Sequence, residues 1–455
     1  MALQFILGPS GAGKSEYIYE DIIRRTMQDE RENVIVLVPE QYSLEIQRKL
    51  VQKHPRGGSF QLVGIGFNRL AYRIFDELHI KPKKVLEDFG KSMLLRKAAQ
   101  EHKEELSLYA GSLDKAGFID EAKSLMSEIY QYDIPRERLR EALQKLDDSE
   151  EARVLARKLQ DMLVIFDAFE EKKGQSFIVA EQMLELLTAA AEQSELIAGS
   201  EIVLDGFTGF TPIQLNLISV LLRRAKKVTI VLTIDAATYE KKHVAEHELF
   251  ALTKQTIEHL LLTAEQAHVV VEPALFLGKD GCKRWSKGHP LAHLEQNLFR
   301  YPYRVGKDEE QAITITAYDT PAQELTGVAE QIRTLVMEQG YRYRDIAIVS
   351  GNLEETAEFA KRILPQYEIP YFIDMTMPVK NHPCVDALTH VLRIVDENFS
   401  YDSVFAFLKS GVVKSLEQSE IEMLENYVLA RGRKGIRSWS QPFLNGEDDT
   451  VDEMR

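Results

Sequence analysis

A glycine-rich stretch near the start of the chain has the residue types and spacing of a phosphate-binding loop. The sequence GPSGAGKS over residues 8–15 fits the pattern G-x-x-x-x-G-K-[ST]. In such a loop the backbone N–H groups and a helix N-terminus face the phosphates, the lysine reaches the β- and γ-phosphates, and the hydroxyl binds Mg²⁺. The pattern therefore predicts that ATP is bound by Gly8, Pro9, Ser10, Gly11, Ala12, Gly13, Lys14 and Ser15. The alternative is a tight glycine turn between a strand and a helix.

The second half of such a site is an aspartate at the end of a buried strand. The run IVLD ends in Asp205, which we expect to hold Mg²⁺ together with Ser15. In hydrolysing enzymes of this type a glutamate commonly follows and activates the attacking water, but here residue 206 is glycine. A missing general base costs about 10²–10⁴ in rate. We therefore expect binding without efficient hydrolysis and assign no catalytic residue; a cap at the strand end is the alternative role of Asp205.

Composition limits the class of protein. The chain has 455 residues, 44% hydrophobic and 28% charged, which is ordinary for a globular protein of two to four domains. The apolar runs at 34–38 and 228–232 are far shorter than the roughly 20 residues of a membrane helix, no secretory signal is recognisable, and two cysteines make no disulfide framework. We expect a cytoplasmic protein without a membrane partner. The net charge of −15 disfavours a surface that binds nucleic acid throughout, although a local basic stripe remains compatible with it.

Hydrophobic patterns predict an α/β fold with two parallel-sheet units, each interrupted by an all-helical insertion. Buried-strand patterns before residue 84 and again at 201–207 and 226–235 indicate a first unit over 1–84 and 195–305. Residues 85–194 have helical periodicity and indicate the first insertion. Strand patterns at 312–319, 345–350 and 369–374 indicate a second unit over 306–380. Residues 381–455 are expected to begin a second helical insertion.

Two kinds of charged pattern leave alternatives open. The basic run ARGRKGIR, with Arg431, Arg433, Lys434 and Arg437, predicts DNA contact or, alternatively, a solvated charged face, and the run RRAKK at 223–227 is a weaker case. HVAEH (243–247) fits a zinc-peptidase pattern, and HPLAH (289–293) has its two histidines at the same spacing. Because such short patterns arise easily, we favour a solvated helix over a zinc site for both.

Further phrases resemble motifs of superfamily-one helicases of the UvrD/RecB type. VLDGFTGFTPIQ (203–214) resembles their second motif, with Gly206 and Gly209 in place of two acidic residues. FNRLAYRI (67–74) resembles a DNA-contacting motif, which implies that Phe67, Asn68 and Arg69 touch single-stranded DNA. YRYRDIAIVSGN (341–352) resembles the start of a second lobe. The resemblance implies P-loop RecA-like lobes with helical insertions.

The chain is identified more specifically as a member of the AddB family, the partner subunits of AddAB helicase–nucleases. VPEQYSLE (38–45), LDGFTGFTP, LAHLE (291–295), YEIPYFID (367–374) with NHP, and LENYVLARGRKG (424–435) occur in the family's order. The resemblance implies a heterodimer with an AddA-type motor subunit, single-stranded and double-stranded DNA ends as partners, recognition of Chi-type hotspots, and a role in recombinational repair. The family's nuclease domain and its iron–sulfur cluster belong to a C-terminal part without counterpart here, so we expect a fragment or a naturally short protein.

Whether the chain is itself an enzyme stays open at this stage. Ser350 and Gly351 occupy the place where helicases often have Tyr-Arg, so an arginine on the γ-phosphate is not expected, and such an arginine contributes about 10³–10⁵ in rate. The leading hypothesis is a hydrolysis-deficient binding module. The alternative is an active DNA-stimulated superfamily-one ATPase or helicase that takes its base from elsewhere. A small-molecule P-loop kinase is a third, weaker alternative.

Overall fold

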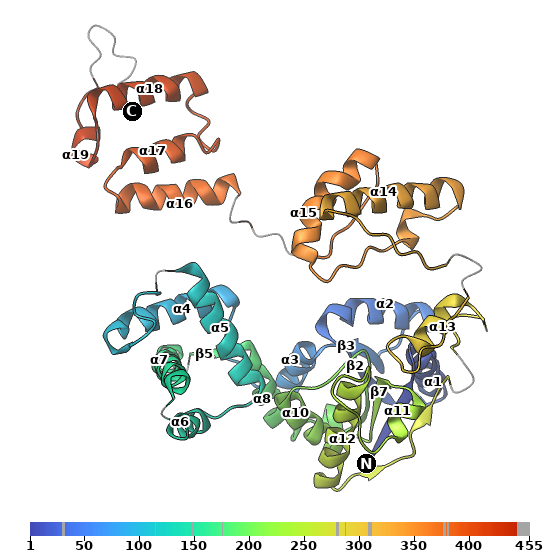
Figure 1. Cartoon of the computed structure of the whole chain (residues 1–455). Coiled ribbons are helices and arrows are strands. Elements are labelled where there is room, and N and C mark those ends of the chain that lie inside the picture. The colour runs from blue at the N-terminus through green and yellow to red at the C-terminus, as the bar shows by residue number, and fades with distance from the viewer. Residues whose placement is uncertain are drawn as a thin grey trace. The chain divides into compact units, whose positions relative to one another are not determined.

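The computed structural model describes residues 1–29, 32–113, 115–147, 149–174, 176–278, 282–286, 288–307, 312–375, 379 and 382–443. The chain divides into two compact units, Met1–Thr314 and Ile315–Arg455. Figure 1 shows a sheet with covering helices in the first unit and helices with extended connections in the second. No helix in the described ranges has the length and apolar character needed to cross a membrane.

A seven-stranded sheet forms the centre of the first unit. Its strands are β1 (Ala2–Gly8), β2 (Asn33–Leu37), β3 (Leu62–Ile65), β6 (Ser200–Leu204), β7 (Lys227–Thr233), β8 (Val270–Val271) and β9 (Leu275–Phe276). The order is β3-β2-β6-β7-β1-β8, β9 also pairs with β1, and every pair is parallel. The predicted parallel α/β sheet is confirmed, while β8 and β9 were not predicted.

Side-chain alternation along the strands divides the core of this unit between the two faces of the sheet. On one face, alternate strand residues pack with α1 (Lys14–Gln28) and α2 (Ser43–Lys53). The other face packs with α3 (Phe67–Glu77), α8 (Ala180–Ala191), α10 (Pro212–Arg224) and α12 (Ala251–Gln266). Figure 1 shows α2 and α12 on opposite sides of the sheet. Both faces are thus buried, as continuous apolar strands require.

A helical segment interrupts this unit between β3 and β6. It contains α4 (Asp88–Glu101), α5 (Ala116–Gln131), α6 (Arg136–Gln144) and α7 (Glu150–Lys173), and α4, α5 and α7 share a hydrophobic core separate from that of the sheet. The predicted helical character is confirmed. A short parallel pair, β4 (Lys84–Leu86) with β5 (Phe177–Val179), was not predicted. Helix α8 already packs in the core of the sheet, so the sheet unit resumes near residue 180 and not at 195.

Shorter helices complete the first unit: α9 (Glu195–Ala198), α11 (Ala236–Glu240) and α13 (Pro290–Asn297). The second unit contains α14 (Pro321–Glu338) and α15 (Leu353–Ile363), which share one core, followed by α16 (Pro383–Asp396), α17 (Tyr401–Leu408), α18 (Gln418–Arg431) and α19 (Ile436–Trp439). The helical character predicted after residue 380 is confirmed for the described part.

The three strands predicted in the second unit are wrong for this structure. Residues 312–319, 345–350 and 369–374 form no ladder among the described residues. Some of their side chains pack on the α14–α15 core, whereas Ile315, Val349 and Phe372 are 94%, 93% and 87% exposed. An apolar run makes a strand only where a neighbouring strand takes up its N–H and C=O groups. Among the described residues, these segments form no strand pairing.

Candidate nucleotide-binding site

The predicted phosphate loop lies between a central strand and a helix. Strand β1 runs to Gly8 in register with β7 on one side, and α1 begins at Lys14. Gly13 precedes α1 with φ 82° and ψ 25°, a left-handed conformation that glycine adopts without steric cost, and no side chain caps this helix end. The first N–H groups of α1 are therefore left for a ligand, and the helix dipole favours an anion there. The strand–loop–helix context on which the nucleotide prediction depended is present.

Lys14 points back across the loop. Its Nζ donates hydrogen bonds to the carbonyl oxygens of Gly8 and Pro9, each at 2.9 Å. Burial lowers the pKa of Lys14 to about 8, although the negative charges of Asp205 and Glu295 act in the opposite direction. A lysine held in this way favours its charged form as soon as a negatively charged group approaches.

Asp205 lies at the same edge of the sheet, directly after β6. Its backbone N–H donates to the Leu37 carbonyl oxygen at 3.0 Å, which extends the pairing of β6 with β2 by one residue. The carboxylate accepts a 2.6 Å hydrogen bond from Tyr19 Oη, and Asp205 is only 6% exposed. Burial, with the neighbouring Asp205 charge, raises the pKa of Tyr19 far above its usual range, so the phenol stays a donor. The structure thus places Asp205 beside α1, close enough for its negative charge to raise the pKa of Lys14 against the effect of burial.

Gly206 follows Asp205, at the position where a catalytic glutamate is expected from the sequence pattern. Its φ is 81°, and a Cβ added there would lie 3.5 Å from Pro39 Cδ, so space is available but the backbone is left-handed. A side chain at this position is disfavoured by about 1–2 kcal/mol. The carboxylate of Glu40, which follows Pro39 in the chain, accepts the Asn68 backbone N–H at 2.8 Å at the start of α3. Gly206 itself has no side chain that could act as a base toward a water molecule.

The donor groups at this site suit a Mg²⁺ ion that arrives with a nucleotide. Within the described residues there is no group of three or more His, Cys, Asp or Glu side chains able to hold a metal ion. The protein offers one hydroxyl, Ser15, and one carboxylate, Asp205, and Mg²⁺ commonly combines one or two such ligands with substrate phosphates and waters. The predicted pair therefore fits the ion.

Two parts of the site were missed by sequence reasoning. Tyr19, five residues after Lys14 on α1, fixes the Asp205 carboxylate, and only the helical period after the loop could have suggested it. Residues of 282–286 and 288–296 also contact the loop. Lys283 and Arg284 donate their backbone N–H groups to the Gly11 carbonyl oxygen. Glu295 accepts the Ser10 backbone N–H, and burial raises the pKa of the Glu295 carboxyl. A cavity of about 1080 Å³ adjoins Pro9 and is lined from these ranges and from β9. No local sequence pattern indicates that this cavity lies near the loop.

The residues predicted to contact DNA differ in accessibility. Phe67 is buried and its ring lies 5.5 Å from that of Phe207, so base stacking by Phe67 would require it to leave the core. Asn68 and Arg69 are exposed at the start of α3 and stay predictions. In the second unit Arg431, Lys434 and Arg437 are exposed. Arg433 is used within the unit, since it donates to the Pro442 carbonyl oxygen at 3.2 Å and covers the Phe443 ring.

The two histidine patterns do not form metal sites in the described structure. HVAEH lies in a turn region between α11 and α12, not on the helix that the pattern needs. In HPLAH, His289 caps α13 by accepting the Leu291 N–H at 3.1 Å. His293 contacts the Arg304 carbonyl oxygen at 2.8 Å. The preference for no zinc site stands, although the predicted helix over HVAEH is wrong.

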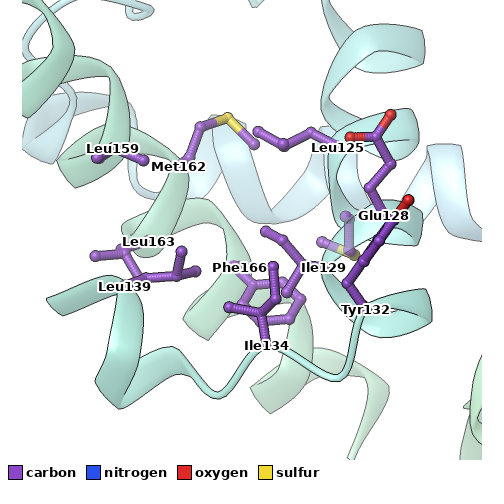
Figure 2. A pocket seen from close by; sticks show the side chains of 11 residues that line it. Leu125, Glu128, Ile129, Tyr132, Ile134, Leu139, Leu159, Met162, Leu163 and Phe166 are labelled. Carbon is purple, nitrogen blue, oxygen red and sulfur yellow. The ribbon is translucent and has the colours of Figure 1, made fainter. Parts of the chain in front are cut away.

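A second cavity lies in the helical segment. Figure 2 shows it between α5, α6 and α7, with Leu125, Ile129, Met162 and Phe166 among its lining residues. Its volume is about 170 Å³, and Glu128 and Tyr132 are its only polar side chains. An almost wholly apolar cavity of this kind has no groups that could activate or orient a reacting ligand, so we place the candidate site at the loop.

The parallel sheet and the glycine-rich loop between β1 and α1 together define an α/β protein with a P-loop-like strand–loop–helix unit. The family model described as "ADDB, N-terminal" matches residues 5–295, and the chain belongs to this family. It is similar to a protein of Lachnoclostridium phytofermentans that is named as a subunit of an "ATP-dependent helicase/deoxyribonuclease", with 38% identity over 96% of this chain and 38% of that protein. The proteins of the same name from Clostridium novyi and Alkaliphilus metalliredigens are 31% and 33% identical over 100% and 98% of this chain. The chain spans about two fifths of the length of these curated relatives.

Proposed function

We propose that this chain is the helicase-like N-terminal part of an AddB-type subunit that holds Mg-ATP without hydrolysing it efficiently. The name of the relatives supports a place in an ATP-dependent helicase and deoxyribonuclease. In this proposal an AddA-type partner supplies the motor, and the complex processes double-stranded DNA ends for recombinational repair. The sheet unit and residues 306–380 act as RecA-like lobes, with residues 85–179 and 381–455 as helical insertions.

One observation carries the proposal: Lys14 and Asp205 converge at the loop while Gly206 leaves the adjoining position without a carboxylate. The first two are what a Mg-nucleotide needs for binding, through charge on the phosphates and an oxygen for the ion. The missing group is the one that would activate water. In this proposal Asp205 serves nucleotide binding, whereas the next residue, Gly206, lacks the side chain that hydrolysis would need.

The DNA part of the proposal assigns single-stranded DNA to exposed basic and polar residues. Asn68 and Arg69 lie in the first turn of α3, Arg431 is the last residue of α18, Lys434 follows it, and Arg437 lies in α19. In this proposal they hold the strand while a Chi-type hotspot sequence passes. Alanine at Asn68 and Arg69 together is expected to weaken binding of a labelled oligonucleotide several-fold and to reduce its salt dependence. Alanine at the exposed pair Lys81 and Lys83 is the matched control.

The deciding experiment is steady-state ATP hydrolysis by the purified chain, with and without single-stranded DNA, alongside a melting curve with Mg-ATP. We expect a raised melting temperature, because a ligand that binds the native state stabilises it, and turnover far below about 1 s⁻¹. Lys14→Ala removes the thermal shift. Turnover above about 1 s⁻¹ that Lys14→Ala abolishes would instead establish the active DNA-stimulated ATPase. An unchanged melting curve at millimolar Mg-ATP would mean that the loop holds no nucleotide.

A further inference from the structure

A short segment far along the chain is fastened to the outside of the phosphate loop. In this segment, Cys282–Trp285, which we call the strap, the backbone N–H groups of Lys283 and Arg284 both donate to the Gly11 carbonyl oxygen, at 3.1 and 3.2 Å. Cys282 Sγ lies 3.5 Å from the Ser10 carbonyl oxygen. The strap is therefore held mainly through backbone hydrogen bonds to the loop, and the Arg284 guanidinium lies over the Trp285 ring at 5.7 Å from its centroid.

The strap brings two further cations to the uncapped end of α1. The Lys283 side chain crosses Gly13, with its Cδ 3.2 Å from the position that a Gly13 Cβ would occupy. Arg284 is near enough for its charge to lower the pKa of Lys14. Both side chains are exposed, and neither forms an ion pair with a residue in the described ranges. These positive charges share the helix end with the carboxylates of Asp205 and Glu295, and the phosphates of a nucleotide would add the negative charge that offsets their mutual repulsion.

Residues of the strap line the cavity of about 1080 Å³ that adjoins Pro9. Trp285 is half-buried, its ring is stacked on His289 with 6.5 Å between the ring centroids, and the cavity lining also includes Phe276 and Gln296. Small-molecule sites typically have volumes of about 300–1,000 Å³ and combine aromatic walls with a few polar groups. A cavity of this size, continuous with a phosphate loop, is suited to the remainder of a nucleotide.

We propose that the strap is a nucleotide-binding element: Lys283 and Arg284 contact the phosphates of a nucleoside triphosphate held by the loop, and Trp285 borders its base. This inference rests on the proposed function in that the loop binds a nucleotide. It adds a set of ligands from the same unit as the loop. Because these cations do not have to arrive from a second lobe, the chain can grip a triphosphate without a cycle of closure, which suits holding more than turnover.

The experiment compares Kd values for Mg-ATP, measured by calorimetry, across four forms of the full chain. These are the unchanged chain, Lys14→Ala, the double variant Lys283→Ala with Arg284→Ala, and the control Lys81→Ala with Lys83→Ala, which removes the same charge from exposed positions of the same unit. We expect the strap variant to bind at least tenfold more weakly, since one hydrogen bond to a charged group contributes about tenfold or more. The control is expected to stay within twofold of the unchanged chain.

Tryptophan fluorescence provides a second readout. In a Trp439→Phe background, Trp285 is the only tryptophan, and its emission should change on addition of Mg-ATP and of Mg-tripolyphosphate to different extents, because only ATP carries a base. Arg284→Lys keeps the charge and should retain part of the affinity. If the chain binds Mg-ATP and Lys14→Ala abolishes binding, but the strap variant matches the control, the strap inference is wrong and the proposed function stands. If the unchanged chain does not bind Mg-ATP, both fail.

Discussion

Two passages of this chain run from an apolar stretch through a glycine-containing turn into a helix, and they differ in whether a side chain caps the helix end. In the first, β1 leads through Gly13 into α1, whose N-terminus has no side-chain cap. In the second, residues 346–350 lead through Gly351 to Asn352, whose side chain accepts the Glu355 N–H at 3.3 Å at the start of α15. Glu354 and Glu355 also place negative charge in the first turn of α15.

The difference shows that a phosphate site depends on what a helix end leaves unsatisfied. At the end of α15 an amide side chain accepts one N–H group, whereas no side chain caps the end of α1, which carries a single acidic residue, Glu16, in its first turn. The strands before the two turns differ as well. β1 lies between paired neighbours, and residues 346–350 have none among the described residues. Rigid support and an open helix end occur together in the first passage only.

The largest expected effect is on the free energy of unfolding, and it compares the paired strand β1 with an unpaired extended segment of the second unit. Ile6 in β1 is 2% exposed, whereas Ile315 in the extended part of the second unit is 94% exposed. Ile6→Ala is expected to lower the free energy of unfolding of its unit by about 2–5 kcal/mol, since it removes buried methylenes and leaves a cavity. Ile315→Ala is expected to stay within about 0.5 kcal/mol. Denaturant unfolding measures the free energy of unfolding of each unit. The fluorescence of Trp285 follows the first unit, and that of Trp439 follows the second. A similar loss at both positions would contradict the exposed arrangement of 312–319.

The contrast between these passages also marks what could be predicted from sequence. The run before the loop, the loop and α1 follow from local pattern, and Asp205 was expected beside them because parallel strands end at one edge of a sheet. The strands of the second unit were predicted from equally apolar runs, but forming them depends on partner strands that no local pattern specifies. The strap lies some 270 residues from the loop and meets it through backbone hydrogen bonds, which leave no residue-type signal.

The second expected effect concerns the glycines of the two turns. Gly13→Ala places a side chain at φ 82° and against Lys283, so we expect a loss of about 1–2 kcal/mol in the stability of the first unit, with weaker Mg-ATP binding. Gly351 has no left-handed φ and nothing within 4 Å of an added Cβ. Gly351→Ala is therefore expected to be neutral or to stabilise by up to about 1 kcal/mol through the unfolded chain. Equal losses from the two substitutions, measured by the same unfolding curves, would remove the distinction between the turns.

A smaller effect is expected at the cap of α15. Asn352→Ala removes the acceptor for the Glu355 N–H and should cost about 1 kcal/mol in the stability of the second unit. Asn352→Gly, the control, should cost only a few tenths because glycine is tolerated at this position. Neither substitution should alter the Mg-ATP thermal shift of the first unit. An Asn352→Ala chain whose second unit unfolds at the unchanged denaturant concentration would show that the amide is not what satisfies this helix end.

The smallest expected effect is a fraction of a proton, and it tests the open end of α1 most directly. The pKa of Lys14 is lowered by burial to about 8, from an ordinary value of 10.5. Between these two values the unfolded chain binds the proton more than the free folded chain does, so the stability of the free protein rises with pH across this range. Phosphates beside Lys14 favour its charged form and raise its pKa again. Binding of Mg-ATP at pH 8.5 should therefore take up part of a proton, and affinity should fall as pH rises above about 8.

Calorimetry in two buffers of different ionisation enthalpy measures this uptake. It should be close to zero at pH 6.5, where Lys14 is charged with or without nucleotide. Lys14→Arg is the matched control, because a guanidinium stays charged throughout this range and should bind Mg-ATP with no proton uptake from this position. Uptake at pH 8.5 that persists in Lys14→Arg would assign the proton to another group, and no uptake in the unchanged chain would mean that the phosphates do not approach Lys14.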